Sequence, residues 1–232
     1  IIPFLIPFLL IMAIGPKLKW IKSNLVDKIY LFTLLIISIL LSILIVKNFS
    51  SNFLINTILI SSALYLFFIT LRDFFNKGFK NLAQNIAHFG FSLLILSILF
   101  NSLFSSEIIT NLKVGQTFEN TKSKIVFKSV SQKEAKNYKS IIGNFIVQDS
   151  KGKIENLSPE LRIYNQPNIT TSEADIKTTL LSDKFMVINV VQNQEFFNVR
   201  YQVKPFMLWI WISVILISFG GLISFVKKEY EK

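Results

Sequence analysis

The chain contains a single histidine, His88, within the stretch NIAHFGFSLL at residues 85–94, which continues as an apolar run to Phe104. Its 232 residues include no cysteine, and this absence excludes a zinc–thiolate site, a disulfide framework and a thiol nucleophile. An imidazole can bind a metal, transfer a proton or exchange hydrogen bonds. Because there is one histidine, another chain would have to complete any metal site or catalytic triad.

Polar residues accompany His88 along one side of this run. They recur at steps of three and four residues, which share one face of a helix. These residues are Asn81, Gln84, Asn85 and Ser92. A ring nitrogen that faced lipid would lack a hydrogen-bond partner, at a cost of several kcal/mol, so we expect this face to look into protein or a cofactor. Gln84 and Ser92 could hold one ring nitrogen. The small residues Ala87 and Gly90 would allow a second helix or a flat macrocycle to approach.

Three roles for His88 remain open on these residues alone. The ring could hydrogen-bond across a helix bundle, ligate a metal or a haem iron, or transfer a proton. A proton relay or an ion-coupled transporter usually needs further ionisable groups inside the membrane. The apolar runs contain no Asp, Glu, Lys or Arg, which disfavours both of these functions.

The composition places this helix in a membrane. Hydrophobic residues make up 51% of the chain, and several charge-free runs reach the roughly 18 residues that a spanning helix needs. We expect spans at 29–46, 53–71, 82–104 and 205–226, the last of them starting at Pro205 and followed by a tail at 227–232. The run at 1–14 is too short to cross a core of about 30 Å, so we interpret it as a truncated helix.

Residues 105–204 have a different character. They are polar, with the alternation of strands at 124–130, 142–147, 186–191 and 196–203. Residues 149–153 and 192–195 have the composition of tight turns, and 173–184 could be a short helix or an irregular crossing. The sequence therefore predicts a polytopic α-helical membrane protein of about five spans, with an all-β domain, a small barrel or sandwich, inserted before the last span.

Charge predicts the orientation. The loops at 15–28 and after Leu71, and the tail at 227–232, are rich in lysine and arginine, which favours the cytoplasmic side for them and the outside for the β domain. The β domain carries +4 of the net charge of +11. Most of the excess positive charge therefore lies in the loops and the tail that face the cytoplasm. Because the orientation of the helices explains this charge, we expect no nucleic-acid partner. Aromatic residues suited to the membrane interfaces are Trp20, Tyr201, Trp209 and Trp211.

Four stretches, taken in order, resemble the C-terminal part of the CcmF-type haem lyase subunits of the cytochrome c maturation system. They are PFLLIMAIGPKLKW at 7–20, AHFG at 87–90, PELRIYNQPNITTSEADI at 159–176 and VRYQVKPFMLWIWISVILISFGGLISF at 199–225. The resemblance implies that His88 is an axial ligand of a haem b within the bundle. In that family the second axial histidine and a tryptophan-rich external segment lie upstream. This chain is therefore expected to be inactive without an N-terminal half that it lacks. The division would arise either because the sequence is truncated or because the gene is split.

The resemblance also implies a reaction and partners. Family members take haem from a haem chaperone and join it through thioether bonds to apocytochrome c, outside a bacterial inner membrane or, alternatively, a mitochondrial one. External family motifs contain six residues that could dock apocytochrome c or other maturation subunits, or could instead hold the β domain together by ion pairs and caps: Glu160, Arg162, Tyr164, Thr171, Glu173 and Asp175. The alternative function is a non-catalytic assembly subunit in which the β domain recruits partners and His88 is structural.

Overall fold

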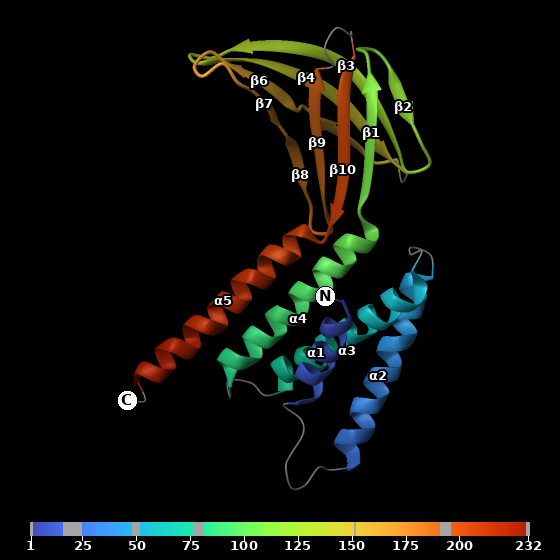
Figure 1. Cartoon of the computed structure of the whole chain (residues 1–232), viewed down its shortest axis with the longest axis vertical. Coiled ribbons are helices and arrows are strands. Elements are labelled where there is room, and N and C mark those ends of the chain that lie inside the picture. The colour runs from blue at the N-terminus through green and yellow to red at the C-terminus, as the bar shows by residue number, and fades with distance from the viewer. Residues whose placement is uncertain are drawn as a thin grey trace. The chain divides into compact units, whose positions relative to one another are not determined.

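The chain divides into a helical unit and a β unit, which we describe separately (Figure 1). The computed structural model describes residues 2–15, 25–47, 52–76, 81–150, 152–190 and 196–230. The helical unit comprises Ile1–Phe104 and Phe206–Lys232, and the β unit comprises Ser105–Pro205. The β unit is therefore an insertion between two helices of the other unit.

The helical unit is built from five described helices. They are α1 (Ile2–Ile14), α2 (Leu25–Val46), α3 (Phe53–Asn76), α4 (Leu82–Phe104) and α5 (Met207–Tyr230). The last four are long and apolar enough to cross a membrane, and the apolar part of α1 is shorter. In hydrocarbon a helix satisfies its own backbone groups, which is why apolar runs of this length fold this way. The expected polytopic membrane fold is confirmed.

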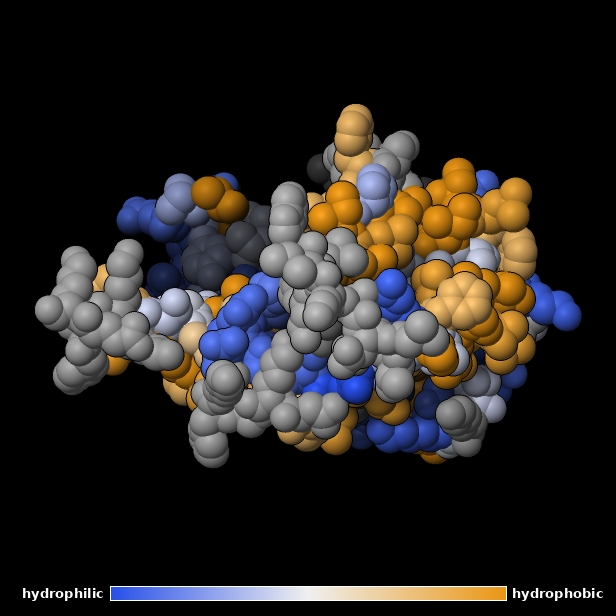
Figure 2. All heavy atoms as spheres, turned by 90° about the horizontal axis from the view of Figure 1, so that it is seen from below, coloured by the Kyte–Doolittle hydropathy of each residue, from blue (hydrophilic) through white to orange (hydrophobic). Residues whose placement is uncertain are grey.

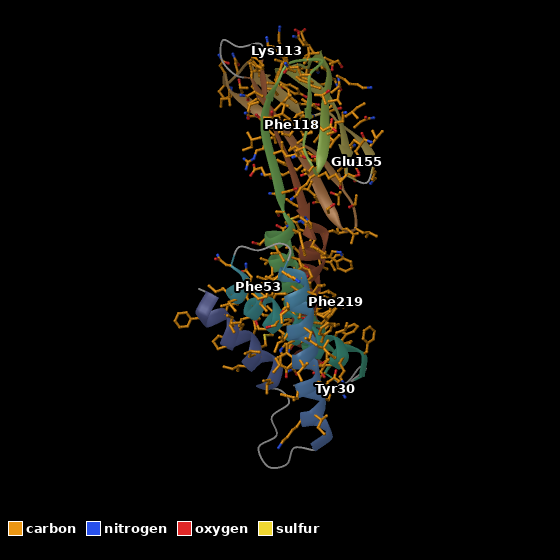
Figure 3. All side chains as sticks on the ribbon, turned by 90° about the vertical axis from the view of Figure 1, so that its right-hand side faces the viewer. Tyr30, Phe53, Lys113, Phe118, Glu155 and Phe219 are labelled. Carbon is orange, nitrogen blue, oxygen red and sulfur yellow. The ribbon has the colours of Figure 1, made fainter. Side chains whose placement is uncertain are left out.

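Large apolar side chains cover the outside of these helices as well as the core. Phe32, Leu44 and Phe219 are exposed, whereas Leu66 and Leu96 are buried between helices. Figure 2 shows hydrophobic residues over much of the described surface in its view, and Figure 3 labels Phe219. A surface of this kind matches the apolar interior of a bilayer, and it would be unfavourable in water.

Helices α4 and α5 approach each other closely. A Cβ atom on Gly220 of α5 would lie 2.8 Å from both the Ala83 carbonyl oxygen and the Ala87 backbone nitrogen of α4. A Cβ atom on Gly90 of α4 would lie 3.0 Å from Leu216 Cβ. Small residues on both helices thus permit backbone contact, as is common where lipid provides no hydrophobic drive for association. A Cβ atom on Gly221, by contrast, would have no neighbour within 4 Å, so the close contact is made by Gly220 and not by the next glycine.

The β unit is a sandwich of two antiparallel sheets. The first sheet contains β1 (Ser106–Leu112), β10 (Phe197–Pro205), β9 (Ser182–Val190) and β8 (Asp175–Thr178), in that order. The second contains β2 (Thr117–Glu119), β3 (Ser123–Glu134), β4 (Tyr138–Asp149), β6 (Glu160–Tyr164) and β7 (Thr170–Glu173), with β5 (Ile154–Leu157) paired to β4. The core between them includes the stacked rings of Phe127 and Phe145, 4.2 Å apart.

Three local expectations were wrong. Residues 173–184 contain the end of β7, β8 and the start of β9 rather than a helix or an irregular crossing, because pairing of β8 with β9 holds them in extended backbone. Pro205 is the last residue of β10 and not the first of a helix, since its fixed φ also suits extended backbone. Tyr201 is buried in the sandwich core and is not an interfacial residue. Trp20 and the turn at 192–195 lie outside the described residues.

A buried ion pair links the two sheets. The ammonium of Lys184 on β9 lies 2.9 Å from a carboxylate oxygen of Glu155 on β5, and the other oxygen of Glu155 (Figure 3) lies 2.8 Å from Lys153. Burial acts to raise the pKa of Glu155, but hydrogen bonds from both lysines outweigh it and hold the pKa below the ordinary 4.5. Because the folded-state pKa is the lower one, this carboxylate stabilises the fold above about pH 4.5 and ceases to do so as the pH falls through the folded-state value.

Gly220→Ala should destabilise the helical unit, because its added Cβ meets backbone atoms of α4 that cannot rotate away. Overpacking of this kind costs about 1–3 kcal/mol. Gly221→Ala is the matched control, since it adds the same methyl group into open space on the same helix. Thermal unfolding in detergent should show a lower midpoint for Gly220→Ala alone. Equal midpoints for the two variants would contradict the close contact.

Lys184→Met should destabilise the β unit by about 3 kcal/mol, because it leaves Glu155 buried with less compensation. Lys177→Met is the control: Lys177 lies opposite Lys184 on β8, yet it is exposed. The free energy of opening, measured by hydrogen exchange across the β unit, should fall in the first variant only. If the free energy of opening fell by a similar small amount in both variants, the ion pair of Lys184 would stabilise the β unit no more than an exposed lysine does.

Candidate functional site

His88 lies about two turns from the start of α4 and is partly buried by the described residues. The polar residues expected beside it divide by environment. Asn85 and Ser92 are buried, while Asn81 and Gln84 are exposed. Other parts of this chain therefore cover the polar face at Asn85 and Ser92 and leave it exposed at Asn81 and Gln84.

One border of the polar face belongs to α3. The Ser92 hydroxyl hydrogen-bonds with Thr70 of α3 at 2.7 Å and donates to the Phe89 carbonyl oxygen at 2.8 Å. The Phe89 ring stacks on Phe74 with centroids 5.4 Å apart. Ser92 therefore serves the contact between α3 and α4, and its expected hydrogen bond to His88 stays a prediction.

The opposite border of α4 belongs to α5. Ala87 and Gly90 are the residues that contact Gly220 and Leu216. The space beside these small residues is therefore filled by a helix, and of the two expected occupants the flat macrocycle is wrong on this side. Successive helical residues turn by about 100°, so His88 points away from the Ala87 side and away from the Phe89 side.

The remaining sector of α4 is the one that His88 shares with Phe91. The ring of Phe91 meets Phe8 of α1 edge to face, with centroids 6.2 Å apart. Towards the start of α4, Asn81 and Gln84 line a groove of about 670 Å³ whose other wall includes Phe219 and Leu222 of α5. The groove therefore lies one to two turns before His88 on the same helix.

The donor set of this sector suits a haem better than a bare metal ion. Within the part of the chain that the structure describes, no three His, Cys, Asp or Glu side chains come together as a metal site. A haem iron needs only an axial ligand from protein, because the macrocycle supplies the other nitrogens. A partly buried imidazole on an apolar helix meets that requirement.

The expected docking residues gather on the strand pair β6–β7. Arg162 lies 3.1 Å from Glu160 on its own strand and 3.9 Å from Glu173 on β7. Its guanidinium also lies 5.1 Å from the centre of the Tyr138 ring, which itself contacts Tyr164. The hydrogen bond to Glu160 raises the pKa of Arg162, so its charge persists. We call these five residues, together with Thr171, the Arg162 face.

Asp175 has a different role from the rest of that set. Its carboxylate accepts a hydrogen bond from the Ser158 backbone N–H at 2.6 Å, which ties β8 to the segment before β6. Thr171 donates to Glu173 at 3.3 Å and remains part of the Arg162 face. Each of the six residues thus makes contacts within the β unit and is also partly exposed, so docking and internal stabilisation both stay predictions for them.

Two features were missed at the sequence level. Tyr138 belongs to the Arg162 face although it lies on β4, and only sheet pairing brings it there: Tyr138 is opposite Tyr164. Lys184 occupies an inward position, and its alternation with Met186 and Ile188 along one strand could have indicated this. A lysine in register with two core residues signals a buried partner of opposite charge.

Comparisons with known proteins agree with this architecture. Residues 103–205 match the family model described as the CcmF C-terminal beta-sandwich. The cytochrome c-type biogenesis protein CcmF of Escherichia coli K12 is 24% identical over 239 residues, which cover 98% of this chain and 37% of that protein. CcmF of Haemophilus influenzae is 26% identical over 245 residues, 97% of this chain and 37% of that protein. The biogenesis protein ccl1 of Rhodobacter capsulatus is 30% identical over 145 residues, 62% of this chain and 22% of that protein.

The fold comparison extends over both units. The solved structure of "Cytochrome c Heme Lyase CcmF" aligns with a TM-score of 0.70 and 17% identity over 95% of this chain and 38% of that one. The chain thus spans between 22% and 38% of the length of these relatives. The family model is similar to the β unit, and the relatives and the solved structure are similar to nearly the whole chain; in each case the similarity is to CcmF-type proteins of cytochrome c biogenesis.

Proposed function

We propose that this chain is the C-terminal part of a haem lyase of cytochrome c maturation and that His88 is an axial ligand of a haem b in its helical bundle. The observation that supports the proposal is that His88 is a partly buried imidazole on an apolar helix, about 100° around that helix from Ala87, which packs on α5. The AHFG motif, shared with the family, is centred on the same residue.

The protein's own contribution is to hold the imidazole in place. Contacts with α5 at Ala87 and with α3 at Ser92 fix the rotation of α4, and with it the direction of the ring. In this proposal Gln84, one turn earlier, would hydrogen-bond the ring nitrogen that does not ligate and so set the tautomer. The apolar helices would limit the access of water to the ring. A bound haem iron supplies a one-electron redox centre there.

The reaction that we propose for the complete lyase is addition of two cysteine thiols of apocytochrome c to the two vinyl groups of a haem. In each addition a C–S bond forms, the vinyl double bond is lost, and the thiol proton is transferred to the second vinyl carbon, so no electrons are lost or gained overall. Within this chain, His88 would hold the bundle haem, and that group would supply one-electron redox chemistry to the complete lyase. The second axial ligand and the substrate haem site lie outside this chain.

We further propose that the β unit lies on the outer side of a bacterial or mitochondrial inner membrane and that the Arg162 face docks the partners of the reaction. Candidates are the apocytochrome, the haem chaperone and other maturation subunits. Arg162 and two tyrosines lie together on this face, and Arg and Tyr are residue types enriched at protein interfaces. The alternative function, an assembly subunit without its own haem, rests on this face alone.

His88→Ala should abolish the b-type haem spectrum of the complete lyase, because it removes an axial nitrogen. Ser102→Ala, an exposed position on the same helix, is the control and should retain the spectrum. Adding imidazole to His88→Ala should restore haem binding in part, which no purely packing role of His88 would produce. An unchanged haem content in His88→Ala would disprove axial ligation and favour the assembly role.

Arg162→Ala should reduce the yield of mature cytochrome c and the capture of the apocytochrome or haem chaperone several-fold, while leaving the bundle haem in place. Lys139→Ala is the matched control, because Lys139 lies on the neighbouring strand β4, faces the other way, and is exposed in an ion pair with Glu134. Hydrogen exchange should confirm that both β units remain folded. Equal yields from the two variants would exclude the Arg162 face as a docking site.

A further inference from the structure

The turn between β8 and β9 presents two leucines to the outside. Leu180 and Leu181 are 70% and 68% exposed. The turn is held by hydrogen bonds between Thr179 and Ser182: the Thr179 hydroxyl donates to the Ser182 carbonyl oxygen at 2.7 Å and accepts from the Ser182 N–H at 3.1 Å. The two apolar side chains are therefore displayed by a fixed turn rather than by a loose loop, which lowers the entropy cost of burying them against something else.

Strand register places this turn beside the point where the chain enters the membrane. Ser182, the first residue of β9, is opposite Pro205, the last residue of β10. Only Phe206 separates Pro205 from Met207, where the spanning helix α5 begins. Neighbouring strands lie about 4.8 Å apart, so Ser182 is within one strand spacing of that point. Because β9 runs antiparallel to β10, Leu181 and Leu180 extend past Pro205 in the direction in which β10 leads towards α5.

The other connection to the membrane lies at the same end of this sheet. The spanning helix α4 ends at Phe104, and Ser106 at the start of β1 is opposite Val203 on β10. Within the β unit, the start of β1, the end of β10 and the β8–β9 turn share one end of the sheet (Figure 1). Two covalent connections to helices long enough to span a membrane therefore leave from this end of the sheet.

We propose that Leu180 and Leu181 insert into the lipid interface at the membrane surface from which α5 begins. Lipid is the occupant that the covalent connections bring within reach, and exposed leucines gain by leaving water for it. Lys177 on β8 and Lys204 on β10, opposite Asp183, lie within a few residues of the turn and suit phosphate headgroups. The turn would thus be a third membrane contact of the β unit, after its two covalent connections.

Single-cysteine labelling tests this proposal cleanly, because the chain has no cysteine of its own. The complete chain carrying Leu181→Cys is labelled with an environment-sensitive fluorophore and reconstituted into phosphatidylethanolamine–phosphatidylglycerol vesicles with nitroxide-bearing lipids. Val114→Cys is the control. Val114 is an exposed hydrophobic residue that follows β1, at the end of the sheet opposite Ser106. Lipid quenching should be several-fold stronger at position 181 than at 114, and headgroup-level nitroxides should quench more than deep ones.

Equal quenching at positions 181 and 114 would overturn the proposal. A label at 181 that is shielded from aqueous iodide but not quenched by lipid would also overturn it, and would show that a protein surface covers the leucines. Leu180→Cys should show the same quenching as Leu181→Cys. Agreement between the two positions would show that the quenching does not arise from the fluorophore at a single position. Hydrogen exchange of the β unit should match the unlabelled chain in every variant. None of these results depends on haem or on His88.

Discussion

The contact between α4 and α5 at Gly220 is the interaction on which the rest of the molecule depends. Backbone atoms of Ala83 and Ala87 lie where any side chain at Gly220 would have to go, so the two helices have one close arrangement rather than a range of them. That arrangement fixes the rotation of α4 about its axis, and so decides which residues face α3, which face α5 and which sector is left. It also joins the two helices between which the β unit is inserted. An insertion is tolerated when its ends lie close together, and here β1 and β10 are hydrogen-bonded neighbours.

The same contact divides the residues of α4 between its neighbours. The α5 side of α4 uses small residues because the backbones touch there, and the α3 side uses a serine hydroxyl and a phenylalanine ring. His88 lies about 100° around the helix from both Ala87 and Phe89 and is partly buried. A histidine moved by one position in the sequence would turn by about 100° and enter one of the packed borders.

Much of this arrangement could be predicted from the sequence, because the membrane imposes strict rules on composition. Charge-free runs identified the spans, and alternation identified most strands. The failures have a common cause, which is that tertiary pairing decides the environment of a residue. Tyr201 has the composition of an interfacial residue, yet its position on the central strand β10 turns it into the core. The hydrogen bond between Ser92 and Thr70 of another helix could not be predicted either, because only the packing of α3 on α4 brings the two hydroxyls together. The sequence predicted the polar residues of α4, but which of them are buried and which are exposed depends on how the neighbouring helices pack.

The placement of His88 also has a consequence for assembly. If this chain supplies one axial bond to a haem and another part of the lyase supplies the second, the haem binds the assembled protein more tightly than either part alone. By linkage, haem then stabilises the assembly by an amount that grows with its free concentration relative to the dissociation constant. A lyase built this way would hold its parts together most firmly when haem is available, which is when its reaction can proceed. The open groove beside Gln84 and the partly buried ring are consistent with a site that is completed from outside this chain.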